Sequence, residues 1–431
     1  MRKLKLIFLL AALSLLIYFS MNSNPANPAS LISPGKVKKD TLFSSQGLKE
    51  YVKGISPLTE KYTRNDGTEV IISGYFRSKL SERYFTAVIN SLTGLEKRLG
   101  KFPLDEITIV ELPQMNKTGE KAFPGGFAIR RNLINYDDIH TIERKCAFFT
   151  AMQYFLKSDE PLWIIKGLSA YYSDKITNYY YGEESHYFFL SDYYPVFGYN
   201  LISYHGIPLV YTLGDYKYGE GTTFLPDYYK RLRYGSPGDT STISSDIITK
   251  RVNTINKPAL LFGTLSNLKG EGFIDGIVND YLAEPGTEKD FPEILKLKLG
   301  ADSTLFFKNF VNTNKIFDYG ISAIKETGNN AYEIKLERFN DGVFPQQIRI
   351  ITENDTLFYK WDGEEKIKLL KIETGLPVVS AEIDPGQKNM FDINFANNSF
   401  TVESRMSATV SISARWFFWM QNLLMYSGSA G

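Results

Sequence analysis

The sequence has very few of the side chains that build disulfides and metal sites. Its 431 residues include one cysteine, Cys146, and three histidines, His140, His186 and His205. A single cysteine excludes a disulfide within the chain and any cysteine-rich zinc fold. The formal net charge is only +1, so no overall field favours a polyanion. We therefore expect no nucleic-acid partner.

Strongly apolar stretches are confined to the two ends of the chain. Residues 6–19 are uncharged and apolar, and three basic residues precede them within the first five. This pattern is typical of a secretory signal peptide or an uncleaved membrane anchor, here over residues 1–21. The run is short for a membrane span, but no small-x-small cleavage site follows it, and we favour an anchor.

The anchor predicts a location outside the cytoplasm. Because positive residues stay on the cytoplasmic side, the remainder of the chain is expected on the extracytoplasmic face of the membrane. Residues 22–47 are rich in Pro, Asn and Ser, which predicts an extended tether between the membrane and the folded part of the chain.

The C-terminal segment, residues 410–428, is nearly apolar and contains Trp416, Phe417 and Trp419. It is too short to span a bilayer, and its aromatic residues fit a helix that lies in the membrane interface. Two alternatives stay open, a terminal helix docked on the core and a contact for a membrane partner.

Residues 138–175 predict two helices joined by a short polar turn. Apolar residues recur every three or four positions in the first helix, and Pro161 suits the start of the second. Gly167 interrupts the second helix. Because glycine weakens a helix, its presence there indicates close packing against another element, such as the first helix.

This helix pair resembles the active-site helices of the gluzincin metallopeptidases, in particular the membrane alanyl aminopeptidase family. That family carries HExxH on the first helix and a glutamate eighteen residues later, within W-x-x-E-G-x-A-x-Y. Trp163, Gly167 and Tyr171 keep the second pattern. The resemblance implies a thermolysin-like fold.

The same resemblance places changed residues at every position that performs chemistry. Glu143 and Ala147 take the places of the two histidines, Arg144 that of the catalytic glutamate and Lys166 that of the third zinc ligand. Alanine cannot coordinate zinc, an ammonium repels it, and arginine stays protonated and cannot act as a base. We therefore expect no cofactor, and we predict an ion pair between Glu143 and Lys166 where zinc would lie.

Two further segments resemble functional parts of that family. Gly125, Gly126, Phe127 and Ala128 take the places of its GAMEN edge strand, with Ala128 where a glutamate binds the substrate amine. An edge strand can still bind an extended peptide by strand addition. Asn256, or a residue near it, takes the place of the tyrosine that stabilises the tetrahedral intermediate.

The fold class predicted is α+β. A thermolysin-like mixed domain with a mainly helical lobe is expected over residues 48–316. From Asp318 the apolar period changes from helical to two, which predicts a small antiparallel β-sandwich over residues 317–404.

These features predict a non-catalytic, membrane-tethered protein that binds a protein partner or an extended peptide, or acts as a scaffold. The alternative is an active hydrolase with rearranged chemistry. His140, Glu143 and Cys146 follow at three-residue steps on one helix, so a Cys/His nucleophile or an unusual metal site is conceivable.

Overall fold

The computed structural model describes residues 52–112, 120–130, 140–156, 160–182, 252–283, 290–310, 315–386, 388–392 and 397–402. The expected anchor, tether and C-terminal helix, with Trp416, Phe417 and Trp419, lie outside these residues. Within the described ranges, no helix is both long and apolar enough to cross a membrane.

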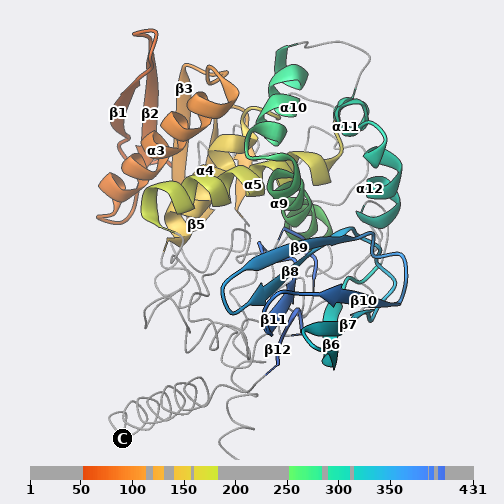
Figure 1. Ribbon diagram of the computed structural model, residues 1–431. Coiled ribbons are helices and arrows are strands. Elements are labelled where there is room, and N and C mark those ends of the chain that lie inside the picture. Colours follow the sequence, from red (N-terminus) through yellow and green to blue (C-terminus); the bar gives the residue numbers. More distant parts are fainter. Residues whose placement is uncertain are drawn as a thin grey trace, which may run out of the picture.

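The N-terminal part of the fold is a mixed five-stranded sheet with helices packed against it (Figure 1). The strand order is β1-β2-β3-β5-β4. The β2–β3 and β3–β5 pairs are parallel, and the two outer pairs are antiparallel. The strands are β1 (Leu58–Thr63), β2 (Glu69–Tyr75), β3 (Glu106–Leu112), β4 (Lys121–Phe123) and β5 (Gly126–Arg130).

Helix α3 (Ser81–Leu99) links β2 to β3 and packs against the sheet, as the crossover between parallel strands requires. Its buried residues recur at helical spacing and include Phe85, Val88 and Leu92. The neighbouring strands β3 and β5 are almost wholly buried, which explains their continuous apolar sequences.

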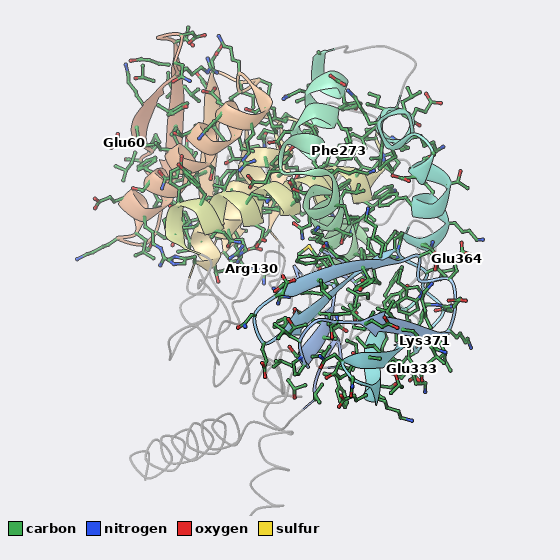
Figure 2. The ribbon with its side chains drawn as sticks, in the orientation of Figure 1. Glu60, Arg130, Phe273, Glu333, Glu364 and Lys371 are labelled. Carbon is green, nitrogen blue, oxygen red and sulfur yellow. The ribbon has the colours of Figure 1, made fainter. Side chains whose placement is uncertain are left out.

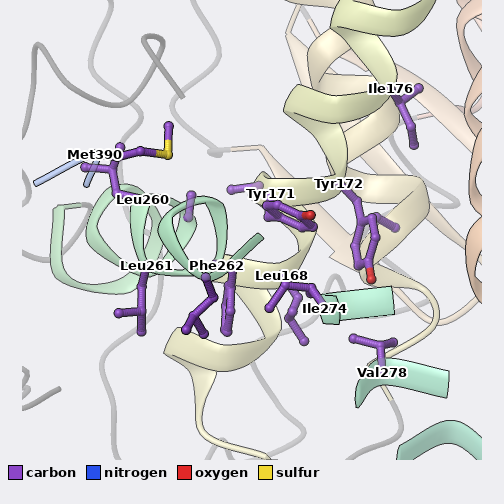
Figure 3. Packing of buried hydrophobic residues seen from close by; sticks show 14 of the residues in the cluster. Leu168, Tyr171, Tyr172, Ile176, Leu260, Leu261, Phe262, Ile274, Val278 and Met390 are labelled. Atoms are coloured by element: carbon purple, nitrogen blue, oxygen red, sulfur yellow. The ribbon is translucent and has the colours of Figure 1, made fainter. Parts of the chain in front are cut away.

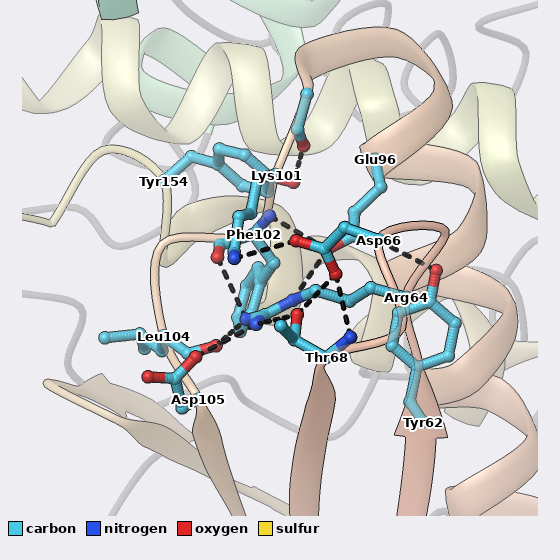
Figure 4. A network of polar contacts seen from close by, with 11 residues as sticks. Tyr62, Arg64, Asp66, Thr68, Glu96, Lys101, Phe102, Leu104, Asp105 and Tyr154 are labelled. Atoms are coloured by element: carbon cyan, nitrogen blue, oxygen red, sulfur yellow. Dashed lines mark hydrogen bonds and ion pairs between the residues drawn. The ribbon is translucent and has the colours of Figure 1, made fainter.

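A buried arginine fixes the end of β1 (Figure 4). The Nε of Arg64 lies 3.2 Å from Oε1 of Glu96 on α3, and its Nη1 lies 2.9 Å from Oδ1 of Asp105. Its Nη2 donates to the carbonyl oxygens of Phe102 and Leu104. Since a buried guanidinium is stable only when its donors are satisfied, this network holds β1, α3 and the start of β3 in one geometry.

The predicted helix pair is present as α4 (Thr141–Met152) and α5 (Leu162–Tyr181). Gly167 does permit a close approach, but its partner is α9 (Lys257–Lys269) rather than α4. A Cβ at Gly167 would lie 2.3 Å from Cβ of Pro258 and 3.1 Å from Phe262. Figure 3 shows Leu168 and Tyr171 of α5 packed beside Phe262.

The remaining helices and two antiparallel sheets complete the described fold. The three-stranded sheet has the order β10-β7-β6, and the four-stranded sheet has the order β12-β11-β8-β9. Their inward side chains alternate with exposed ones, as the period-two sequence predicts. The elements are α10 (Gly272–Ala283), α11 (Phe291–Leu299), α12 (Asp302–Phe310), β6 (Tyr319–Gly328), β7 (Ala331–Arg338), β8 (Gln346–Thr352), β9 (Thr356–Trp361), β10 (Ile367–Glu373), β11 (Val378–Ile383) and β12 (Ser399–Thr401).

Aromatic contacts join these sheets to the helices. Phe310 of α12 stacks on Phe317, with ring centroids 4.7 Å apart, and its ring also contacts Phe391. The backbone N–H of Met390 donates to Oγ1 of Thr264 on α9. Buried stacked rings and a satisfied buried hydroxyl together stabilise this junction.

The close contact at Gly167 predicts a specific stability loss. Replacing Gly167 with alanine forces α5 and α9 apart and should lower the free energy of unfolding by about 2 kcal/mol. Gly276→Ala on α10 is the matched control, because a Cβ there meets nothing within 4 Å. That variant should be neutral or stabilising by up to about 1 kcal/mol. Chemical denaturation of both variants measures the difference, and equal stabilities would contradict the predicted contact.

Candidate functional site

The candidate site lies where α4 and α5 meet. The hydroxyl of Ser173 on α5 donates to the carbonyl oxygen of Arg144 on α4, at 2.6 Å. Nη1 of Arg144 lies 2.8 Å from Oδ1 of Asp174, and both side chains are buried. Arg144, which the sequence resemblance aligns with a catalytic glutamate, therefore forms a buried ion pair between the two helices.

Glu143 is held by an arginine from α3. Oε1 and Oε2 of Glu143 accept hydrogen bonds from Nε and Nη2 of Arg83, at 2.5 and 2.8 Å. The Glu143 side chain is only 6% exposed, and the bidentate contact raises the pKa of Arg83. Nδ1 of His140 lies 3.9 Å from Oε2 of the same carboxylate.

The predicted ion pair between Glu143 and Lys166 was wrong. The carboxylate pairs with Arg83, which is 60 residues away in the sequence. No ion pair of Lys166 within 4.0 Å is found among the residues that the structure describes. Arg83 was not found by motif reasoning, since nothing in the helix pair itself points to α3.

Lys166 is buried at the crossing of α5 and α9. It is 4% exposed and directly precedes Gly167, where the two helices touch. Burial alone lowers the pKa of Lys166 from the ordinary 10.5 to about 8. Lys257, at the start of α9, is also buried, and burial lowers its pKa to about 8 as well. Two buried amines thus flank the contact between Gly167 and Pro258.

The two remaining expected positions, Ala147 and Asn256, are both buried. Ala147 is buried in the apolar core. Asn256 ends a π-helical turn, Val252–Asn256, that leads directly into α9, and it is fully buried. Asn256 therefore lies two residues before Pro258, where α9 contacts Gly167 of α5.

These residues do not fit a zinc site. Zinc needs three donor side chains and one open position, whereas this site offers a carboxylate already paired with arginine, a methyl group and an amine. Within the described ranges no three His, Cys, Asp or Glu side chains are grouped so that they could hold a metal ion.

The rearranged Cys/His site also lacks support. His140 and Glu143 do approach each other, and His140 stacks on Tyr181 with ring centroids 5.0 Å apart. Cys146, however, is completely buried, and burial raises its pKa well above the usual value. A buried protonated thiol is a poor nucleophile.

The expected edge strand is an internal strand. β5 pairs with β3 on one side and with β4 on the other, so the backbone of Phe127 and Ala128 is not available for strand addition. Gly125 has a φ of +84°, and a Cβ at Gly126 would lie 2.3 Å from the carbonyl oxygen of Thr108. The glycine pair therefore serves a turn and a close strand contact.

Comparison with known proteins finds similarity in three dimensions only. No protein-family model and no curated protein sequence matches the chain. The fold is similar to that of an aminopeptidase A from Legionella pneumophila, crystallised with aspartic acid. The TM-score is 0.51 at 11% identity, over 80% of this chain and 41% of the other. The chain thus corresponds to less than half of that protein.

An M1 zinc metallopeptidase from Deinococcus radiodurans has a TM-score of 0.40 at 13% identity, over 60% of this chain and 52% of the other. This second likeness has a TM-score below 0.5. The first likeness confirms a mixed α and β fold similar to that of an aminopeptidase, which the sequence resemblance predicted.

The buried amine of Lys166 predicts a pH-dependent stability. Between pH 8 and 10.5 the unfolded chain holds a proton on this lysine that the folded chain has lost, so the free energy of unfolding rises with pH. The rise amounts to about 3 kcal/mol for this group. Lys166→Met should remove it and should be more stable than the native chain at pH 7.

Lys308→Met on α12 is the matched control, since Lys308 is exposed. Denaturation curves at several pH values between 7 and 10.5 measure each slope. The placement of Lys166 would be refuted if native protein and Lys166→Met showed the same pH dependence.

Proposed function

We propose that this protein is a non-catalytic, thermolysin-like relative of the aminopeptidases that acts as a binding or scaffold subunit. The observation that carries this proposal is the contact between Arg83 and Glu143. Glu143 is the one residue at the expected ligand positions whose side chain could bind a metal ion. Its carboxylate is instead bound by the guanidinium of Arg83 from α3.

Three charges together disfavour the family's reaction. Arg83 and Arg144 are permanently protonated, and each is committed to a carboxylate on α4 or α5. Lys166 adds a third basic group on the same pair of helices. A divalent cation placed among these groups would be repelled, and the two guanidinium groups cannot accept a proton from water as the catalytic carboxylate of a metallopeptidase does.

The proposed location is the extracytoplasmic face of a membrane. Its support is the basic and apolar N-terminal sequence, the tether of residues 22–47, and the aromatic C-terminal segment. A protein partner or an extended peptide is the ligand class that agrees with a peptidase-like fold without peptidase residues.

Metal content and hydrolysis test this proposal together. The purified full chain, incubated with zinc and desalted, should contain well below one zinc ion per chain and should not cleave a panel of aminoacyl-coumarin substrates. A variant with Glu143→His, Arg144→Glu, Ala147→His and Lys166→Glu restores the zinc motif of the family and serves as the gain-of-binding comparison.

Arg83→Met, added to that variant, removes the competing cation and should increase its zinc content further. Stoichiometric zinc in the native protein, together with cleavage of any substrate, would refute the non-catalytic role.

A further inference from the structure

The outer strand β1 leaves one side of its backbone unpaired. In the described part of the chain β1 pairs only with β2, so every second residue of β1 directs its N–H and C=O away from the sheet. Five of its six residues are exposed, and Leu58 is 49% exposed. An exposed edge of this length is a template for pairing with another extended chain.

A groove runs between β1 and the first turns of α3. Its volume is about 430 Å³, and Leu58, Glu60, Glu82, Phe85 and Ile89 contribute to its walls. This size lies within the range of natural ligand sites. The groove therefore places three apolar side chains, among polar ones, directly beside an unpaired strand edge.

The groove is acidic. Glu60 of β1 and Glu82 of α3 are both exposed, and neither forms a hydrogen bond or ion pair with the residues that the structure describes. Figure 2 shows Glu60 at the outer side of β1. Lys61 pairs with Glu69, and because side chains alternate along a strand it lies on the opposite face and does not neutralise the groove.

The edge is rigid as well as open. The Arg64 network ties the strand end that follows Tyr62 to α3 and to the start of β3. The hydroxyl of Tyr62 also donates to Glu96. A strand that is already held in its bound conformation loses little entropy when a partner pairs with it.

We propose that β1 and this groove form a docking site for an extended segment of a partner protein that carries apolar and basic side chains on one face. The segment adds to β1 as a sixth strand, and the main-chain hydrogen bonds provide affinity. Its side chains on the α3 side meet Leu58, Phe85 and Ile89 and the two carboxylates. The carboxylates provide the preference for lysine or arginine.

This inference names a partner chemistry for the proposed binding role and rests on that role, but not on the residues between α4 and α5. Zinc binding and peptide docking are measured separately, so either result can fail while the other holds.

The test uses the full chain and a labelled hexapeptide, acetyl-Lys-Thr-Val-Thr-Lys-Thr-amide, which places lysine and valine on one face. The matched probe replaces both lysines with glutamate. Fluorescence polarisation should show saturable binding of the lysine peptide and at least about tenfold weaker binding of the glutamate peptide, since two exposed charge pairs become repulsive. Two further peptides carry N-methyl groups on alternate backbone amides, one on the odd positions and one on the even positions. Only the peptide whose methylated amides face β1 should lose binding.

Variants of the groove assign the site. The double variant Glu60→Gln and Glu82→Gln should weaken the lysine peptide about tenfold, and Leu58→Lys should weaken it further. Glu326→Gln, on the exposed part of β6, is the control and should change nothing. These positions are exposed, so unchanged melting temperatures confirm that the variants fold.

Three results would overturn the inference. They are no saturable binding at millimolar peptide, equal binding of the lysine and glutamate peptides, and native affinity in the double variant. If Leu58→Lys instead changes the sedimentation coefficient of the protein while leaving peptide affinity unchanged, the edge pairs with a second copy of this chain, which also contradicts the proposed partner.

Discussion

The buried amine of Lys166 constrains how α5 packs against α9. It lies at the crossing of α5 and α9, beside a glycine that allows the two helices to touch. Burial lowers the pKa of this amine to about 8. In the proposed non-catalytic role, the charge of the protonated amine disfavours a divalent cation. Elsewhere on the helix pair, Arg83 binds the carboxylate of Glu143 and Arg144 pairs with Asp174.

The fold is similar to that of an aminopeptidase, but the side chains at the expected site differ from those of a zinc peptidase. The likeness to an aminopeptidase covers 80% of this chain and shows the fold alone. At the positions where the sequence resemblance expects zinc ligands, the structure has Glu143 bound to Arg83, Ala147 in the apolar core and Lys166 buried on α5. Under the proposed non-catalytic role, these helices serve packing, and the binding surface lies elsewhere on the fold. The exposed edge of β1, with its acidic groove, is such a surface.

Local patterns in the sequence predicted local structure well. Helical spacing placed α4 and α5, and the change of period near Asp318 marked the start of the strands at Tyr319. Long-range partners could not be predicted. The pairing of Glu143 with Arg83 depends on where α3 lies, and the partner of Gly167 depends on α9. The expected edge strand β5 is internal because β4 pairs with it. This pairing was missed because β4, with only three residues, is too short to recognise from sequence.

The central claim is that the carboxylate of Glu143 binds the guanidinium of Arg83 and not a metal ion. A crystal structure of the full chain soaked in zinc, with diffraction recorded at the zinc absorption edge, tests it most directly. The account predicts no anomalous peak between α4 and α5 and a bidentate contact of Arg83 with Glu143. An anomalous peak coordinated by Glu143, with Arg83 displaced, would contradict it.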